Sequence, residues 1–320
     1  MARAEHLTYP KADKIISRYS YKAVLLTALI ALLTACASAP TETETVPYAE
    51  EELRDTDRDL IFATEFPVAS KDEAIARAET ARKSGDINKA LFFYVKALKF
   101  DPDDADLLAV IGRLHQQQGN DTLAVRAYSM ALENRPDMAN VLEARGLILL
   151  SHDEEERAVA DLTRAVALNQ NAWKAYNGLG LVADKRGDHV AAVAHYDAAL
   201  AINPNSGPVL NNRGYSKLLA DDFEGAGEDL GRAARELGHK QAWVNLGTLM
   251  TRWGYFDLAV EAYEQVLPQP EALNKVAEAA MGKGDYVTAR KLLEQAIILS
   301  PTYFPAAEDN LAQVRERQGG

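Results

Sequence analysis

The chain has 320 residues, with 47 acidic against 35 basic side chains and a formal net charge of −12. An acidic balance of this size disfavours nucleic-acid binding, which needs a basic face. The single cysteine excludes an intramolecular disulfide bond.

Residues 1–36 are predicted to be an export signal and not part of the fold. The segment begins with the basic residues Lys11, Lys14, Arg18 and Lys22. An apolar run over residues 23–33 follows, and small residues end it. This order is typical of a secretory signal, and the run is too short to span a bilayer.

The end of the signal resembles the lipobox of bacterial lipoproteins. The motif is Leu33-Thr34-Ala35-Cys36. The resemblance implies that Cys36 carries a covalent diacylglycerol and becomes the first residue of the mature chain. Ala37 in place of aspartate implies sorting to the outer membrane, facing the periplasm. The alternative is an ordinary signal peptide with an unrelated cysteine.

Residues 37–69 are predicted to be a flexible tether. They are rich in threonine and glutamate, and Pro40 and Pro47 interrupt them. A segment of this composition cannot bury enough apolar surface to fold alone. It would hold the rest of the chain away from the membrane surface.

From residue 70 onward the chain repeats itself about every 34 residues. Tyr94-x-x-Ala97 precedes Asp101-Pro102, and the same pattern returns at Tyr128 and again at Tyr196. A fixed period of this length indicates a repeat architecture. The repeats start near Lys71, Ala105, Ala139, Trp173, Gly207, Lys240 and Pro270.

Four positions within the repeat carry the pattern. Position 8 is Gly or Ala, position 20 is Ala, position 24 is Tyr or Leu, and position 27 is Ala in six repeats and Val in one. Positions 4, 7, 8 and 11 fall on one face of a first helix, and positions 20, 24 and 27 fall on one face of a second. Small residues at 8 and 20 permit close approach, and the large residue at 24 fills the space beside them. Glycines at position 15 are predicted to make the turn between the helices.

This pattern resembles the tetratricopeptide-repeat family over residues 70–301. The resemblance implies an all-α, right-handed superhelical solenoid of about seven helix-turn-helix repeats. The seventh repeat is expected to have a short first helix, because Pro268 and Pro270 delay its start. Residues 302–320 are predicted to form a C-terminal capping helix, since a stack needs polar ends.

Two repeats depart from the pattern in the same way. The third has Arg145 and Asp161, and the fifth has Arg213 and Asp229, with 16 residues between the partners in both. We expect each arginine to pair with its aspartate across the two helices of its repeat, as a structural ion pair.

The resemblance places positions 2, 5, 6 and 9 of the first helices on a concave, peptide-binding face. An amide there could bind the main chain of an extended peptide, because it offers both a donor and an acceptor. The candidate residues of such a groove are Lys174, Asn177, Leu181, Asn211, Asn212, Tyr215 and Asn245. The alternatives are that these side chains are merely solvated, or that the convex face binds.

The sequence contains no pattern that indicates catalysis. None of the six histidines pairs at the i, i+4 spacing of a helical zinc site, and no phosphate-binding loop or nucleophile elbow is present. We therefore expect no enzyme, no metal, and no cofactor beyond the lipid on Cys36. The expected partners are proteins and, through the lipid, a membrane.

Two stretches resemble the TadD family of tight-adherence (Flp pilus) lipoproteins. They are residues 178–189, GLGLVADKRGDH, and residues 209–216, VLNNRGYS. The resemblance implies a scaffold that assists Flp pilus assembly, with a secretin or another pilus component as partner. The alternatives are a type IV pilus or secretin pilotin and an adaptor lipoprotein for cell-wall hydrolases.

Overall fold

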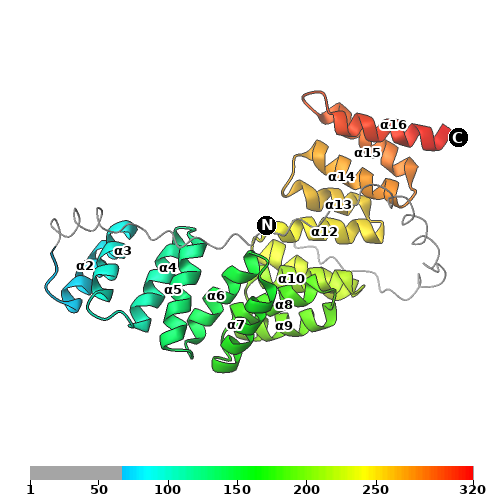
Figure 1. Ribbon diagram of the computed structural model, residues 1–320. Helices are drawn as coiled ribbons and strands as arrows, with labels where there is room; N and C mark the ends of the chain where they lie inside the picture. Colours follow the sequence, from blue (N-terminus) through cyan, green and yellow to red (C-terminus); the bar gives the residue numbers. More distant parts are fainter. Residues whose placement is uncertain (1–66, 320) are drawn as a thin grey trace, which may run out of the picture. The chain divides into compact units, whose positions relative to one another are not determined.

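The computed structural model describes residues 67–319, and these form a continuous row of helical hairpins with no strand among them (Figure 1). The predicted signal, Cys36 and most of the predicted tether lie outside the described residues. The first helices of the hairpins are α2 Lys71–Lys83, α4 Ala105–Gln117, α6 Ala139–Ser151, α8 Trp173–Lys185, α10 Gly207–Leu219, α12 Lys240–Trp253 and α14 Gln269–Gly282. The second helices are α3 Ile87–Leu98, α5 Asp121–Asn134, α7 Glu155–Leu168, α9 His189–Ile202, α11 Phe223–Gly231, α13 Phe256–Glu264 and α15 Tyr286–Leu299.

The predicted fold class, an all-α solenoid of helical hairpins, is confirmed. A five-residue π-helix, η1 Arg232–Glu236, continues α11, and α16 Pro305–Gly319 ends the row. Helix α16 packs on α15 and buries Ala307, Leu311 and Val314. None of the helices that the structure describes is both long and apolar enough to cross a membrane.

The turn inside each hairpin has a left-handed residue at position 15, as the glycines there predicted. Gly187 has a φ of +79° and Gly254 a φ of +83°. Asp153 and Asp221 occupy the same position in the third and fifth repeats, with φ values of +60° and +62°. Aspartate tolerates this conformation better than most residues with a side chain, but it remains strained there.

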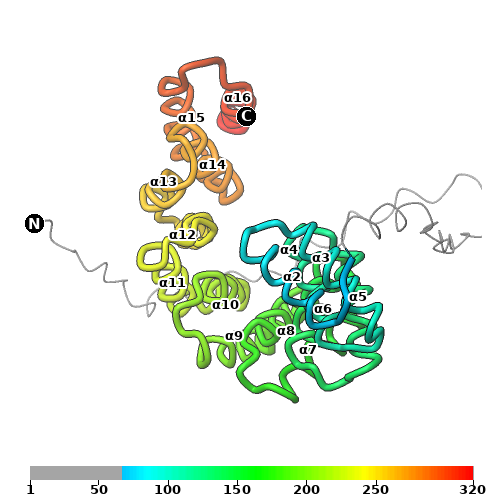
Figure 2. Tube along the Cα trace, turned by 90° about the vertical axis from the view of Figure 1, so that its left-hand side faces the viewer, coloured from blue at the N-terminus to red at the C-terminus, as the bar shows by residue number. Residues whose placement is uncertain are grey.

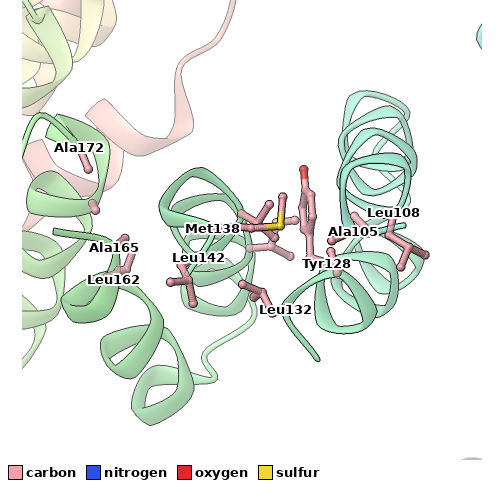
Figure 3. Close-up of a cluster of buried hydrophobic side chains, with 14 of the residues drawn as sticks. Ala105, Leu108, Tyr128, Leu132, Met138, Leu142, Leu162, Ala165 and Ala172 are labelled. Atoms are coloured by element: carbon pink, nitrogen blue, oxygen red, sulfur yellow. The ribbon is translucent and has the colours of Figure 1, made fainter. Parts of the chain in front are cut away.

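Packing within a hairpin depends on contact between positions 8 and 24. A Cβ atom added to Gly180 would lie 2.5 Å from the Tyr196 ring, and one added to Gly112 would lie 2.6 Å from the Tyr128 ring. Real Cβ atoms do not approach so closely, so the glycine makes room for the large side chain. Figure 3 shows the core around Tyr128, which extends to Leu142 and Leu162 in the next repeat.

Successive first helices also touch one another. From α6 onward each first helix contacts the next, whereas successive second helices in the described residues make no comparable contact. Figures 1 and 2 show α8, α10 and α12 side by side. The first helices therefore line the inner side of the row.

The prediction that the seventh repeat has a short first helix is wrong. Helix α14 has 14 residues, and Pro270 lies in its first turn, where a missing N–H costs nothing. The helix that is shortened is instead α13, which has 9 residues, whereas α5, α7, α9 and α15 have 14 each. The sixth repeat is therefore the short one, because its second helix, α13, ends early.

Candidate partner-binding face

The inner side of α8 and α10 carries the largest exposed side chains of the predicted groove. Leu181 is 40% exposed and Tyr215 is 41% exposed, at position 9 of neighbouring repeats. Lys174 is exposed at the start of α8, with its Nζ atom 5.7 Å from the centre of the Trp173 ring. The structure therefore leaves three of the seven predicted groove residues free to meet a partner.

The four asparagines of the predicted groove are hydrogen-bonded to one another. Nδ2 of Asn212 donates to Oδ1 of Asn177 (3.1 Å), which joins α10 to α8. Nδ2 of Asn245 donates to Oδ1 of Asn211 (2.8 Å), which joins α12 to α10. A longer contact of 3.4 Å from Asn211 to Asn212 connects the two pairs into one chain of amides.

Burial separates these asparagines into two kinds. Asn211 and Asn245 are buried, whereas Asn177 and Asn212 are half-buried. A buried amide must be hydrogen-bonded, and here a neighbouring repeat supplies the partner. The peptide-contact role of the four stays a prediction. The structure adds a second role, which is to hold successive first helices together.

The same arrangement returns at the C-terminal end. Nδ2 of Asn310 on α16 donates to Oδ1 of Asn274 on α14 (3.0 Å). In every case the donor is at position 6 of one helix and the acceptor at position 5 of the helix before it. We call these three contacts amide rungs. The step from α12 to α14 has none, because Val244 and Lys275 occupy the two positions.

The predicted ion pairs are confirmed. Arg145 binds both carboxylate oxygens of Asp161, at 2.7 and 2.8 Å, and also donates to Oγ of Ser129 in the preceding repeat (2.9 Å). Arg213 binds both oxygens of Asp229, at 2.7 and 2.5 Å. Both aspartates are buried, so these contacts belong to the packing of the stack and not to the exposed face.

A polar cluster around Asp184 was not predicted. One of its oxygens accepts from the Tyr196 hydroxyl (2.9 Å) and from Oγ of Ser216 in the next repeat (2.5 Å). Its other oxygen lies 2.9 Å from Nδ1 of His189. Burial, followed by the Asp184 charge, raises the pKa of Tyr196 above its ordinary value. The signal that could have found the cluster is Ser216, a hydroxyl at a position that is apolar in every other repeat except the first, which has Thr80.

The other titratable groups of the described residues form no candidate metal centre. Within residues 67–319, no group of three His, Cys, Asp or Glu side chains is placed to hold a metal ion. Burial raises the pKa of Glu143, and an N–H of Ala175 in the next repeat opposes the shift. This hydrogen bond joins Glu143 to the next repeat.

Family models described as "Tetratricopeptide repeat" match residues 72–139, 143–207 and 240–267, which together are half of the chain. No curated protein sequence matches it.

Three solved structures are similar to this chain, and the first two named here have the same fold. A tetratricopeptide repeat protein from Parabacteroides merdae is 17% identical with a TM-score of 0.55, covering 76% of this chain and 98% of its own. The Cut9–Hcn1 hetero-tetramer of the APC/C is 18% identical with a TM-score of 0.54, covering 80% of this chain and 51% of its own. MamA is 25% identical with a TM-score of 0.47, covering 52% of this chain and 94% of its own.

Proposed function

The chain belongs to the tetratricopeptide-repeat family, and we propose that it is a membrane-anchored scaffold that assists assembly of the Flp pilus. The coarser part of this function follows from the family, whose fold is that of a protein–protein interaction scaffold. The pilus, the anchor and the identity of the partner are the proposal.

The observation that supports a partner-binding face is the exposure of Leu181 and Tyr215 on adjacent first helices. Large apolar and aromatic side chains carry much of the binding energy at protein interfaces. They occupy position 9 of the adjacent first helices α8 and α10, so a single extended segment on that side could reach both. Lys174 lies about two helical turns before Leu181 on α8 and would supply a cation for an acidic residue of the partner.

The membrane anchor is proposed from the sequence alone. The motif that ends at Cys36 supports a covalent lipid, and Ala37 supports delivery to the outer membrane with the repeats facing the periplasm. The resemblance of residues 178–189 and 209–216 to the TadD family supports pilus assembly, with a secretin or another pilus component as partner. A pilotin and an adaptor for cell-wall hydrolases are the other outcomes of the test below.

The partner can be identified by photocrosslinking in living cells. A benzophenone amino acid replaces Tyr215 in the full chain, and the matched control replaces Tyr255, which is 40% exposed but lies at a hairpin turn. We expect Tyr215, and not Tyr255, to trap a pilus protein that mass spectrometry identifies. A cell-wall hydrolase in its place would favour the adaptor function. Equal trapping at both positions would refute an inner binding face.

The anchor has a separate test. Cys36→Ser removes the only thiol, so the variant should move from the membrane fraction to the soluble fraction. Covalent acyl chains contribute about 0.8 kcal/mol per buried methylene, and their loss should release the chain completely. A variant that stays with the outer membrane would contradict the lipoprotein proposal.

A further inference from the structure

One step between repeats differs from those around it. The steps α8–α10, α10–α12 and α14–α16 are each closed by an amide rung, but the step α12–α14 is not. Val244 stands where the acceptor amide would be. Lys275 stands where the donor would be, and its Nζ atom lies instead 5.8 Å from the centre of the Tyr263 ring.

The early end of α13 falls at the same step. After Glu264 the chain turns, with the N–H groups of Val266 and Leu267 both donating to the carbonyl of Tyr263, and enters α14 at Gln269. The last turn and more of a 14-residue second helix is therefore absent beside the start of α12. An open pocket of about 390 Å³ lies there. Its lining residues are Lys240, Gln241, Val244, Glu264, Gln265, Val266, Leu267 and Pro268.

The lining has an apolar part and a polar part. Val244, Val266 and Leu267 are half-buried, which is what an unfilled apolar surface shows. The side chains of Lys240 and Glu264 make no ion pair within residues 67–319. Two opposite charges beside an apolar surface suit a ligand that carries both signs around an apolar group.

We infer that this pocket binds an apolar side chain of a partner polypeptide, with an acidic neighbour at Lys240 and a basic neighbour at Glu264. The inference rests on the proposed scaffold function and specifies what part of a partner is read. The amides of Gln241 and Gln265 on the lining can serve main-chain N–H and C=O groups, which an extended segment presents. The volume lies at the lower end of the range for ligand pockets and suits one side chain with its flanking peptide groups.

Blocked tripeptides provide a direct probe. The full chain, labelled on its Val and Leu methyl groups, is titrated with acetyl-Glu-Leu-Lys-amide and, as the control, with acetyl-Glu-Ser-Lys-amide. We expect saturable shifts of the Val244, Val266 and Leu267 methyl signals with the leucyl peptide, and at least tenfold weaker binding of the seryl peptide. Equal shifts with both peptides, or no shift with either, would overturn the inference.

A pocket-filling variant tests the location. Val244→Phe should reduce binding of the leucyl peptide at least tenfold, whereas Val190→Phe, at a position 79% exposed on α9, should leave it unchanged. If Val244→Phe does not fold, the double change Lys240→Ala and Glu264→Ala should weaken the peptide at least threefold. Unchanged binding in the folded variant would refute the site.

The outcomes separate this inference from the proposed function. If Tyr215 still traps a pilus protein in cells while Val244→Phe has no effect on peptide binding, the scaffold function stands and the pocket does not. If the leucyl peptide binds at the pocket but no protein is trapped at Tyr215, the pocket stands and the inner-face scaffold proposal fails.

Discussion

Replacing Arg145 by methionine should destabilise the stack more than any other change to its charged core. The substitution keeps most of the apolar stem and removes both hydrogen bonds to Asp161, which is 7% exposed. A buried carboxylate that loses its partner typically costs about 3 to 5 kcal/mol. The nearby Ser129 hydroxyl accepts from the arginine and does not bind the aspartate, and within residues 67–319 Asp161 has no second ion pair.

Arg213→Met should cost less, although Arg213 pairs with two carboxylates. Asp229 keeps a second cation, because Nζ of Lys217 lies 2.8 Å from one of its oxygens. The loss is then mainly that of charge-assisted hydrogen bonds, about 1.5 to 3 kcal/mol. The second partner of Arg213, Asp197, has a side chain that is 56% exposed, and such surface pairs contribute little.

The two variants are compared by urea unfolding of the full chain, monitored by circular dichroism. The midpoints report stability provided that the dependence of the unfolding free energy on urea, the m value, is the same for both. Arg145→Met should unfold at the lower urea concentration, and adding Asp161→Leu should recover much of the loss, because no charge then stays buried unpaired. Equal midpoints for the two arginine variants, or a larger loss for Arg213→Met, would refute the reasoning. The photocrosslinking yield at Tyr215 should be the same in the Arg145 variant as in the parent, once both are folded.

Three further changes test the packing, the turns and the effect of pH. Gly180→Ala places a methyl group against the Tyr196 ring and should cost about 1 to 3 kcal/mol in urea unfolding; no loss would mean that the ring moves freely. Asp221→Gly removes the side chain from a residue in the left-handed region, and the strain relieved exceeds the entropy that glycine loses by about 0.5 kcal/mol. The melting temperature should therefore rise by about one or two degrees, and a decrease in melting temperature would contradict the strain. Burial lowers the pKa of His115 in the folded chain. As the pH decreases below about 6.5, the unfolded chain therefore binds a proton at His115 at a higher pH than the folded chain does, and the free energy of unfolding decreases. His115→Leu should therefore lose less melting temperature than the parent between pH 7.5 and 5.5, and an equal loss would exclude this histidine.

Much of the fold could be predicted because the repeat fixes each residue's surroundings. Position 8 carries glycine in five repeats, and each of them faces the large side chain at position 24. The 16-residue separation of Arg145 and Asp161 equals the distance from position 7 to position 23, so their pairing followed from the hairpin alone. Contacts within one hairpin depend only on local spacing.

Contacts between hairpins were harder to predict. The asparagines at positions 5 and 6 were identified, but their pairing needs the offset between successive first helices, which the sequence does not state. Ser216 reaches Asp184 across the same boundary. The sequence shows that the sixth repeat, from Lys240 to Pro270, is shorter than the others, but the length of a repeat does not indicate which of its helices has lost residues. Pro270 suggested the wrong helix, because proline is as acceptable in a first turn as it is disruptive inside a helix.

The amide rungs explain how the step from α12 to α14 differs from the steps on either side of it. An amide pair contributes little net stability, since both groups were hydrogen-bonded to water before folding, but leaving one buried amide unpaired costs about 1 to 3 kcal/mol. The rung between α10 and α12 therefore penalises any slip of one helix along the other, because a slip would leave Asn211 or Asn245 buried without a partner. Where Val244 and Lys275 replace the pair, no such penalty fixes the approach of α12 and α14. A partner side chain that fills the space beside Val244 would supply there the contact that the rungs supply elsewhere.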